Sequence, residues 1–104
     1  MARYAMVVQS RPREGREADY NAWYDEVHLA DVAALPGVVS GRRFEFAGGM
    51  VGEPGQPYLA IYEIETEDMQ AFVAELGRRL TDGTMRQTDA MDGSASVVWF
   101  YKAR

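Results

Sequence analysis

The sequence predicts a single α+β domain with the ferredoxin-like order strand–helix–strand–strand–helix–strand. Three observations support this fold class: four apolar runs have strand length, two segments have helical period, and turn-forming residues separate them. Right-handed crossovers and antiparallel neighbours then favour a four-stranded antiparallel sheet with both helices on one face. A chain of 104 residues has room for one core, so we expect residues 1–104 to form one domain.

A polar turn separates the first strand from the first helix. Residues 5–9 are an apolar run rich in β-forming residues, and the turn-forming residues 10–15 close it. From about Arg16 the apolar residues recur at helical spacing. The helix is expected to end at Leu35, because residues 36–37 are Pro-Gly and cannot continue it.

The rest of the chain predicts three strands and a second helix. Residues 38–46 and 58–65 are strand-like and are joined by a segment rich in glycine and proline, which suggests a hairpin. Thr66 is expected as the N-cap of a helix over residues 67–80, where apolar residues recur at steps of three and four. The fourth strand is expected over residues 96–102.

The fourth strand is apolar on both faces. Val97, Trp99 and Tyr101 share one face, and Val98 and Phe100 share the other. A sheet with one face in water should instead alternate apolar with polar residues. Because the chain is too short for a third layer, we expect a second copy to cover the open face, which makes the protein a homodimer.

Composition excludes several classes of function. The chain has 11 basic and 16 acidic residues, so its net charge of −5 disfavours a nucleic-acid partner. It lacks the roughly 18 to 20 consecutive apolar residues of a membrane span and a signal-like N-terminus, so we expect a cytoplasmic protein with no membrane partner. There is no cysteine, only one histidine and no phosphate-binding glycine motif. We therefore expect neither a metal nor an organic cofactor.

Residues 20–29 carry the strongest candidate for chemistry. On a helix, His28 lies one turn after Tyr24 and three residues from both Asp25 and Asp31. An imidazole near a carboxylate can be oriented and kept basic, as general acid/base catalysis near neutral pH requires. A lone histidine at the edge of an apolar stripe is also common as a packing residue, so the spacing leaves both roles open.

Tyr62 and Glu63 form a second candidate group on a strand expected at the centre of the sheet. Adjacent residues point to opposite faces, so one of them faces the helices and the other faces the partner copy. A glutamate in that position is costly unless it is paired, and the expected partner is Arg42 or Arg43, depending on the register. Glu63 is therefore either an active-site acid or half of an ion pair that sets register or dimer geometry.

Several strand residues combine an aromatic ring with a polar atom. Such side chains suit a pocket for a flat organic ligand, although stripes of this kind also occur simply as core. The residues are Tyr4, Tyr58, Tyr62, Trp99 and Tyr101.

Residues 23–28 (WYDEVH) and 35–44 (LPGVVSGRRF) together resemble the EthD-like branch of the dimeric α+β barrel superfamily. The resemblance implies two ferredoxin-like subunits whose sheets form a barrel, with a pocket between sheet and helices in each subunit. His28 matches the helix-one histidine of that family, and Tyr24 matches the tyrosine one turn earlier. The family motif has a proline where this chain has Ala30, so we expect a straighter helix that sets His28 differently.

The residues and the resemblance together predict a cofactor-independent enzyme of cyclase or isomerase type. It would act by proton transfer on an aromatic, polyketide-like or lactone substrate, with His28 as the base and Tyr62 or Tyr24 as the hydrogen-bond donor to the enolate. Two alternatives stay open: a non-catalytic protein that binds a hydrophobic metabolite, and a cofactor-free monooxygenase. The residues expected to bind the substrate are Tyr20, Trp23, Arg43, Glu63 and Trp99.

Overall fold

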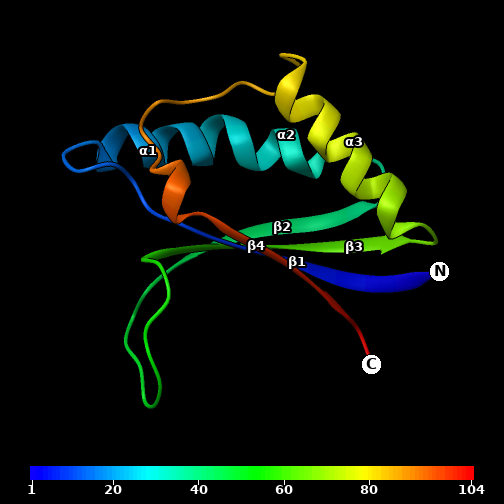
Figure 1. Ribbon diagram of the computed structural model, residues 1–104, viewed down its shortest axis with the longest axis horizontal. Coiled ribbons are helices and arrows are strands. Elements are labelled where there is room, and N and C mark those ends of the chain that lie inside the picture. Colours follow the sequence, from blue (N-terminus) through cyan, green and yellow to red (C-terminus); the bar gives the residue numbers. More distant parts are fainter.

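A computed structural model describes residues 1–104 and contains a four-stranded antiparallel sheet with helices on one face (Figure 1). The strand order is β2-β3-β1-β4, so β3 and β1 are central. This arrangement confirms the predicted ferredoxin-like α+β fold. The elements in chain order are β1 (Ala2–Ser10), α1 (Glu17–Trp23), η1 (Tyr24–His28), α2 (Leu29–Ala33), β2 (Val38–Glu45), β3 (Tyr58–Thr66), α3 (Met69–Thr81), η2 (Gly93–Ala95) and β4 (Val97–Lys102).

The predicted first helix has a π-helical centre. The five residues of η1 lie between the α-helical segments α1 and α2, and the backbone dihedrals at both junctions are helical. The helix is thus not α-helical throughout, and our expectation of a straighter helix, based on Ala30 in place of a proline, did not anticipate this π-turn. A π-turn widens the helix and is frequently found at functional sites. Here it contains both Tyr24 and His28.

The second helix begins later than the sequence suggested. Its N-cap is Asp68, whose carboxylate accepts a hydrogen bond from the Ala71 amide at 3.0 Å. The prediction of Thr66 as N-cap is wrong, because Thr66 is the last residue of β3 and pairs with Ala2. Its hydroxyl instead accepts a hydrogen bond from the Asp68 amide at 3.1 Å. A carboxylate at the cap also interacts favourably with the helix dipole, which favours the later start.

The core lies between the sheet and the helices. Even-numbered residues of the two central strands face the helices, and apolar side chains of the helices pack against them. The buried hydrophobic residues are Met6, Tyr20, Tyr24, Val32, Leu35, Ala60, Tyr62, Ile64, Phe72, Met85 and Ala90.

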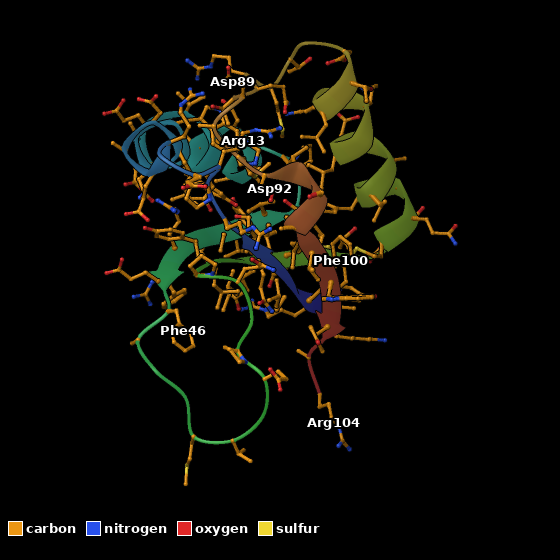
Figure 2. The ribbon with its side chains drawn as sticks, turned by 60° about the vertical axis from the view of Figure 1, so that its left-hand side comes forward. Arg13, Phe46, Asp89, Asp92, Phe100 and Arg104 are labelled. Carbon is orange, nitrogen blue, oxygen red and sulfur yellow. The ribbon has the colours of Figure 1, made fainter.

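The other face of the sheet has no covering layer in the chain itself. Trp99 and Tyr101 are 59% and 61% exposed, and the predicted assignment of the β4 residues to the two faces agrees with the register. The long β2–β3 connection and the C-terminal end both extend on this side (Figure 1). Figure 2 shows Phe46 at the start of that connection and Arg104 at the end of the chain. No helical segment has both the length and the hydropathy needed for a membrane span.

Candidate functional site

A cavity of about 150 Å³ lies between the helices and the sheet. Most of its wall is apolar, with a few polar side chains from the helix, β3 and the segment before β4. Such a combination of an apolar wall and sparse polar groups is typical of small-molecule sites. The lining residues are Met6, Val8, Trp23, Tyr24, His28, Val32, Tyr62, Leu76, Leu80, Gln87, Met91, Ser96 and Val98.

Three aromatic side chains from the end of α1 and the π-turn line this cavity: Trp23, Tyr24 and His28. The Trp23 ring stacks on the His28 imidazole with centroids 4.3 Å apart and an interplanar angle of 17°. The Tyr24 ring meets the same imidazole edge-on at 5.1 Å. Trp23 is itself anchored, because its Nε1 donates to the Arg86 carbonyl at 3.0 Å. His28 is therefore held between two rings rather than by a hydrogen bond.

The segment before β4 contributes Gln87, Met91 and Ser96 to the cavity wall and is tied to the turn before α1. The Arg13 amide donates to the Ala90 carbonyl at 2.7 Å, and Arg13 Nε donates to the Asp89 carbonyl at 2.9 Å. Arg11 and Asp92 form an ion pair at 2.9 Å. Figure 2 shows Arg13, Asp89 and Asp92 together at this end of the molecule. These contacts position the neighbouring cavity residues 91 and 96.

Two buried polar atoms that belong to cavity residues make no hydrogen bond of good geometry: His28 Nδ1 and Tyr62 Oη, although the neighbouring Tyr24 phenol is close enough to influence the pKa of Tyr62. Leaving a buried polar atom unsatisfied costs about 1–3 kcal/mol, so such atoms are rare in folded proteins. His28 and Tyr62 both line the same cavity. Their two free hydrogen-bonding positions are the main chemical feature of the site.

Burial shifts the pKa values of these groups toward their neutral forms. It lowers the pKa of His28 to about 4, and the nearby Asp31 carboxylate only partly opposes this. Burial likewise raises the pKa of Tyr24 to about 12 and that of Tyr62 well above its usual range. We expected a carboxylate to keep His28 basic, and that expectation is wrong because desolvation outweighs Asp31. At neutral pH the cavity therefore holds a neutral imidazole and protonated phenols.

A glycine in β2 makes room for the ring of Tyr62. A Cβ atom at Gly41 would lie 2.8 Å from Cδ1 of Tyr62 and 3.4 Å from Cδ1 of Leu29. Gly41 and Tyr62 are paired across the two strands. Sequence reasoning did not assign this role, although a glycine within a strand is a recognised signal of close approach.

The remaining predicted site residues lie outside this cavity. Tyr20 is fully buried, and its hydroxyl is within 2.6 Å of the Ser10 hydroxyl. Arg43 is on the helix side of the sheet beside a separate open pocket. Glu63 and Trp99 are on the opposite, open face. The structure therefore brings Trp23, Tyr24, His28 and Tyr62 together and leaves the other predicted residues apart from them.

The predicted pairing of Glu63 with Arg42 or Arg43 is wrong. Glu63 instead accepts a hydrogen bond from Arg3 at 2.6 Å, and Arg3 also contacts Glu65. The reason is the register: Ser40 lies opposite Glu63 on β2 and Arg43 is on the helix side, whereas β1, the other neighbour of β3, sets Arg3 opposite Glu65 on the face of Glu63. The Glu63 side chain is 42% exposed in the single chain, so this pair is accessible to water.

Several cavity residues had no signal in the sequence. Gln87 and Ser96 come from the irregular segment before β4, and no periodicity marks such a segment. Leu76 and Leu80 were predicted only as part of a helix stripe. The structure contains no group of three or more acidic, histidine or cysteine side chains that could hold a metal ion.

Comparisons with known proteins support the fold. No protein-family model matches the chain, and no curated protein has a significant match. Among solved structures, the crystal structure of an ethyl tert-butyl ether D (EthD) family protein from Bacillus halodurans matches with a TM-score of 0.64. The match covers 100% of both chains at 13% sequence identity.

The chain has an EthD-like fold. The resemblance that residues 23–28 and 35–44 suggested is thus confirmed at the level of the fold. At 13% identity, similarity of this kind concerns the path of the backbone. Function has to be argued from the cavity and its residues.

Proposed function

We propose that this EthD-like chain is a cofactor-independent enzyme that moves a proton on a small carbonyl compound bound in the cavity of His28 and Tyr62. The observation that carries the proposal is the presence of two buried, unpartnered polar atoms in one apolar cavity. One atom, His28 Nδ1, can accept a proton when the neutral imidazole carries its hydrogen on Nε2. The other, Tyr62 Oη, can donate to an oxygen.

The reaction that fits these two groups is enolisation. His28 Nδ1 takes a proton from the carbon next to the carbonyl, and the electron pair of the broken C–H bond forms the enolate double bond. Tyr62 donates a hydrogen bond to the carbonyl oxygen as negative charge develops there. Return of the proton to a different carbon gives an isomer, and attack of the enolate carbon within the same molecule gives a cyclic product.

The low pKa of His28 bears on how this base works. An imidazole with a pKa of about 4 is fully available as an acceptor at neutral pH but holds a proton weakly. An enolate oxygen beside the imidazolium would favour the charged form, because opposite charges close together raise the pKa of the base. The basicity of His28 therefore increases along the reaction coordinate.

The volume of the cavity selects among the predicted substrates. A cavity of about 150 Å³ accommodates a molecule the size of benzene, whereas drug-sized ligands occupy roughly 300–1,000 Å³. A single-ring aromatic ketone, phenol or lactone fits this space. A multi-ring polyketide would need the segment before β4 to move.

Hydrogen exchange tests the proposal without knowledge of the natural substrate. Small cyclic ketones and lactones are incubated with the protein in D₂O, and loss of the α-hydrogen signal is followed by NMR. We expect exchange above the buffer rate that His28→Asn abolishes and Tyr62→Phe reduces about 10²-fold or more. Tyr101→Phe, an exposed phenol on the other face, is the matched control and should exchange like the wild type.

A non-catalytic binding protein is the second candidate, and the low basicity of free His28 favours it. In that case the same ring compounds bind, and the His28→Asn and Tyr62→Phe variants lose affinity. No exchange of the α-hydrogens above the buffer rate would be seen with any bound compound. Tight binding without exchange would therefore replace the enzyme proposal with this one.

We further propose that two copies pair through the open faces of their sheets. The face carries a cluster of apolar side chains from all four strands, which is larger than the isolated exposed residues of an ordinary surface. A second copy related by a two-fold axis offers the same apolar surface in return. The cluster comprises Val7, Phe44, Leu59, Ile61, Val97, Trp99 and Tyr101.

A further inference from the structure

Arg43 is the most buried cation among the ion-paired side chains of the molecule. It lies in β2 on the helix side of the sheet, and its side chain is only 13% exposed. A guanidinium in such a position must be paired and hydrogen-bonded to be tolerated. It does not line the cavity of His28, so any effect on that cavity has to pass through another residue.

Two side chains of the first helix hold the guanidinium in place. Nη1 donates to the Asp25 carboxylate at 2.6 Å, and Nη2 donates to the Asn21 side-chain oxygen at 2.9 Å. Asn21 is itself oriented, because its Nδ2 donates to the Tyr58 hydroxyl at 3.1 Å. This network joins α1 and η1 to β2 and β3.

Three tyrosine rings surround the same guanidinium. Its Cζ lies 4.4 Å from the ring centroid of Tyr24, 5.3 Å from that of Tyr58 and 5.5 Å from that of Tyr20. All three distances are within the roughly 6 Å range of cation–π attraction. The closest ring belongs to Tyr24, which also lines the cavity and contacts His28.

Tyr24 therefore lies between a fixed positive charge and the cavity. We propose that Arg43 is a positioning residue of this site: its guanidinium orients the Tyr24 ring and polarises the cavity phenols, which makes them stronger hydrogen-bond donors to an anionic oxygen. Burial raises the pKa values of Tyr24 and Tyr62, and the Arg43 charge opposes both shifts. The proposed use of these phenols rests on the proposed function, whereas the polarisation itself does not.

The ion pair with Asp25 does not fully cancel the electrostatic effect of the Arg43 charge on the tyrosine rings. The Asp25 side chain is 62% exposed and lies on the solvent side, where water weakens its field. The tyrosine rings lie in the interior, where the effective dielectric constant is lower and the guanidinium acts more strongly. Removing the Asp25 charge should thus strengthen the effect of Arg43 on Tyr24.

The test replaces Tyr24 with a fluorinated tyrosine that ionises nearer neutral pH and follows its pKa by fluorine NMR without any ligand. Arg43→Met should raise that pKa by about one pH unit or more, since an opposite charge at this distance lowers it by a comparable amount. Asp25→Asn, which keeps a hydrogen-bond acceptor on an exposed residue, should lower it. The other titratable or charged groups that face Tyr24 are Tyr20, His28 and Tyr62, and they are unchanged in both variants.

Arg42→Met is the matched control. Arg42 is the adjacent residue on the open face, where its guanidinium lies 5.4 Å from the Phe44 ring centroid. This variant should leave the pKa at position 24 unchanged. A purely structural role for Arg43 would not produce opposite shifts in the Arg43 and Asp25 variants.

The outcomes separate this proposal from the proposed function. If Arg43→Met does not fold, the test rests on the Asp25→Asn variant, whose substitution is at an exposed residue. An unchanged or raised pKa at position 24 in that variant overturns the role of Arg43. If the pKa at position 24 shifts in the expected directions but no α-hydrogen exchange is seen with any compound, the proposed reaction is wrong and the polarisation by Arg43 stands. Hydrogen exchange without these shifts would remove only the role of Arg43.

Discussion

The indole of Trp23 stacks on the imidazole of His28, with centroids 4.3 Å apart and 17° between the planes. The ring covers one face of the imidazole, and the Tyr24 ring meets it edge-on. Water is kept from the histidine by these contacts, which is the physical cause of its low pKa. The ring contacts around the π-turn thus keep the His28 imidazole neutral in the cavity.

Removing the indole should make His28 more basic. In Trp23→Leu, water gains access to the imidazole, and its pKa should rise from about 4 by roughly one pH unit or more toward 6.5. The measurement is an NMR titration, which is unambiguous because the chain has a single histidine. Trp99→Leu, on the other face of the sheet, should leave the titration as in the wild type. A folded Trp23→Leu protein with an unchanged value would contradict the desolvation argument.

His28 should also make stability depend on pH between about 4 and 6.5. Its pKa is lower in the folded state than in the unfolded chain, so the unfolded state binds more protons in this window. The contribution of His28 to the free energy of unfolding is therefore fully present above about pH 6.5. It is lost as the pH decreases toward 4, and the total loss is about 3 kcal/mol. Urea unfolding at a series of pH values measures this slope. His28→Asn should flatten it, and equal slopes in both proteins would contradict the assignment.

Gly41→Ala should displace the Tyr62 ring. The added Cβ would lie 2.8 Å from Cδ1 of that ring, so the ring or the strand must move, at a cost of about 1–3 kcal/mol in stability. Gly77→Ala is the matched control, because Gly77 lies within α3 with no atom within 4 Å of an added Cβ. That change should stabilise the helix by roughly 0.5–1 kcal/mol. Thermal or urea unfolding distinguishes the two, and Gly41→Ala as stable as the wild type would show that the ring is not confined.

The wild-type protein should be a dimer in solution at micromolar concentration. Trp99→Lys places a charge within the apolar cluster on the open face and should give a folded monomer, since Trp99 is 59% exposed in the single chain. Val73→Lys, on the exposed side of α3, should remain dimeric. Light scattering or analytical ultracentrifugation gives the mass directly. A monomeric wild type at these concentrations would remove the pairing proposal.

The prediction of the fold succeeded where periodicity and turn residues act locally. The change from strand to helical period near Arg16 and the Pro36-Gly37 stop depend only on neighbouring residues, and the observed elements begin and end within a few residues of the expected positions. The N-cap of α3 was misplaced because Thr66 and Asp68 are both good caps. Pairing of Thr66 with Ala2 in the sheet, a contact across the chain, decided between them.

The sequence by itself determined the order of the elements, the two faces of β4 and the spacing that puts Tyr24 and His28 one helical turn apart, because each depends on residues close together in the chain. Only the tertiary structure decided that Arg3 rather than Arg42 or Arg43 pairs with Glu63, since that depends on the register of β3 with both of its neighbours. The same holds for the low pKa of His28. Desolvation is a property of everything packed around a group, and here it comes from segments as distant in sequence as Trp23, Tyr62 and the residues before β4.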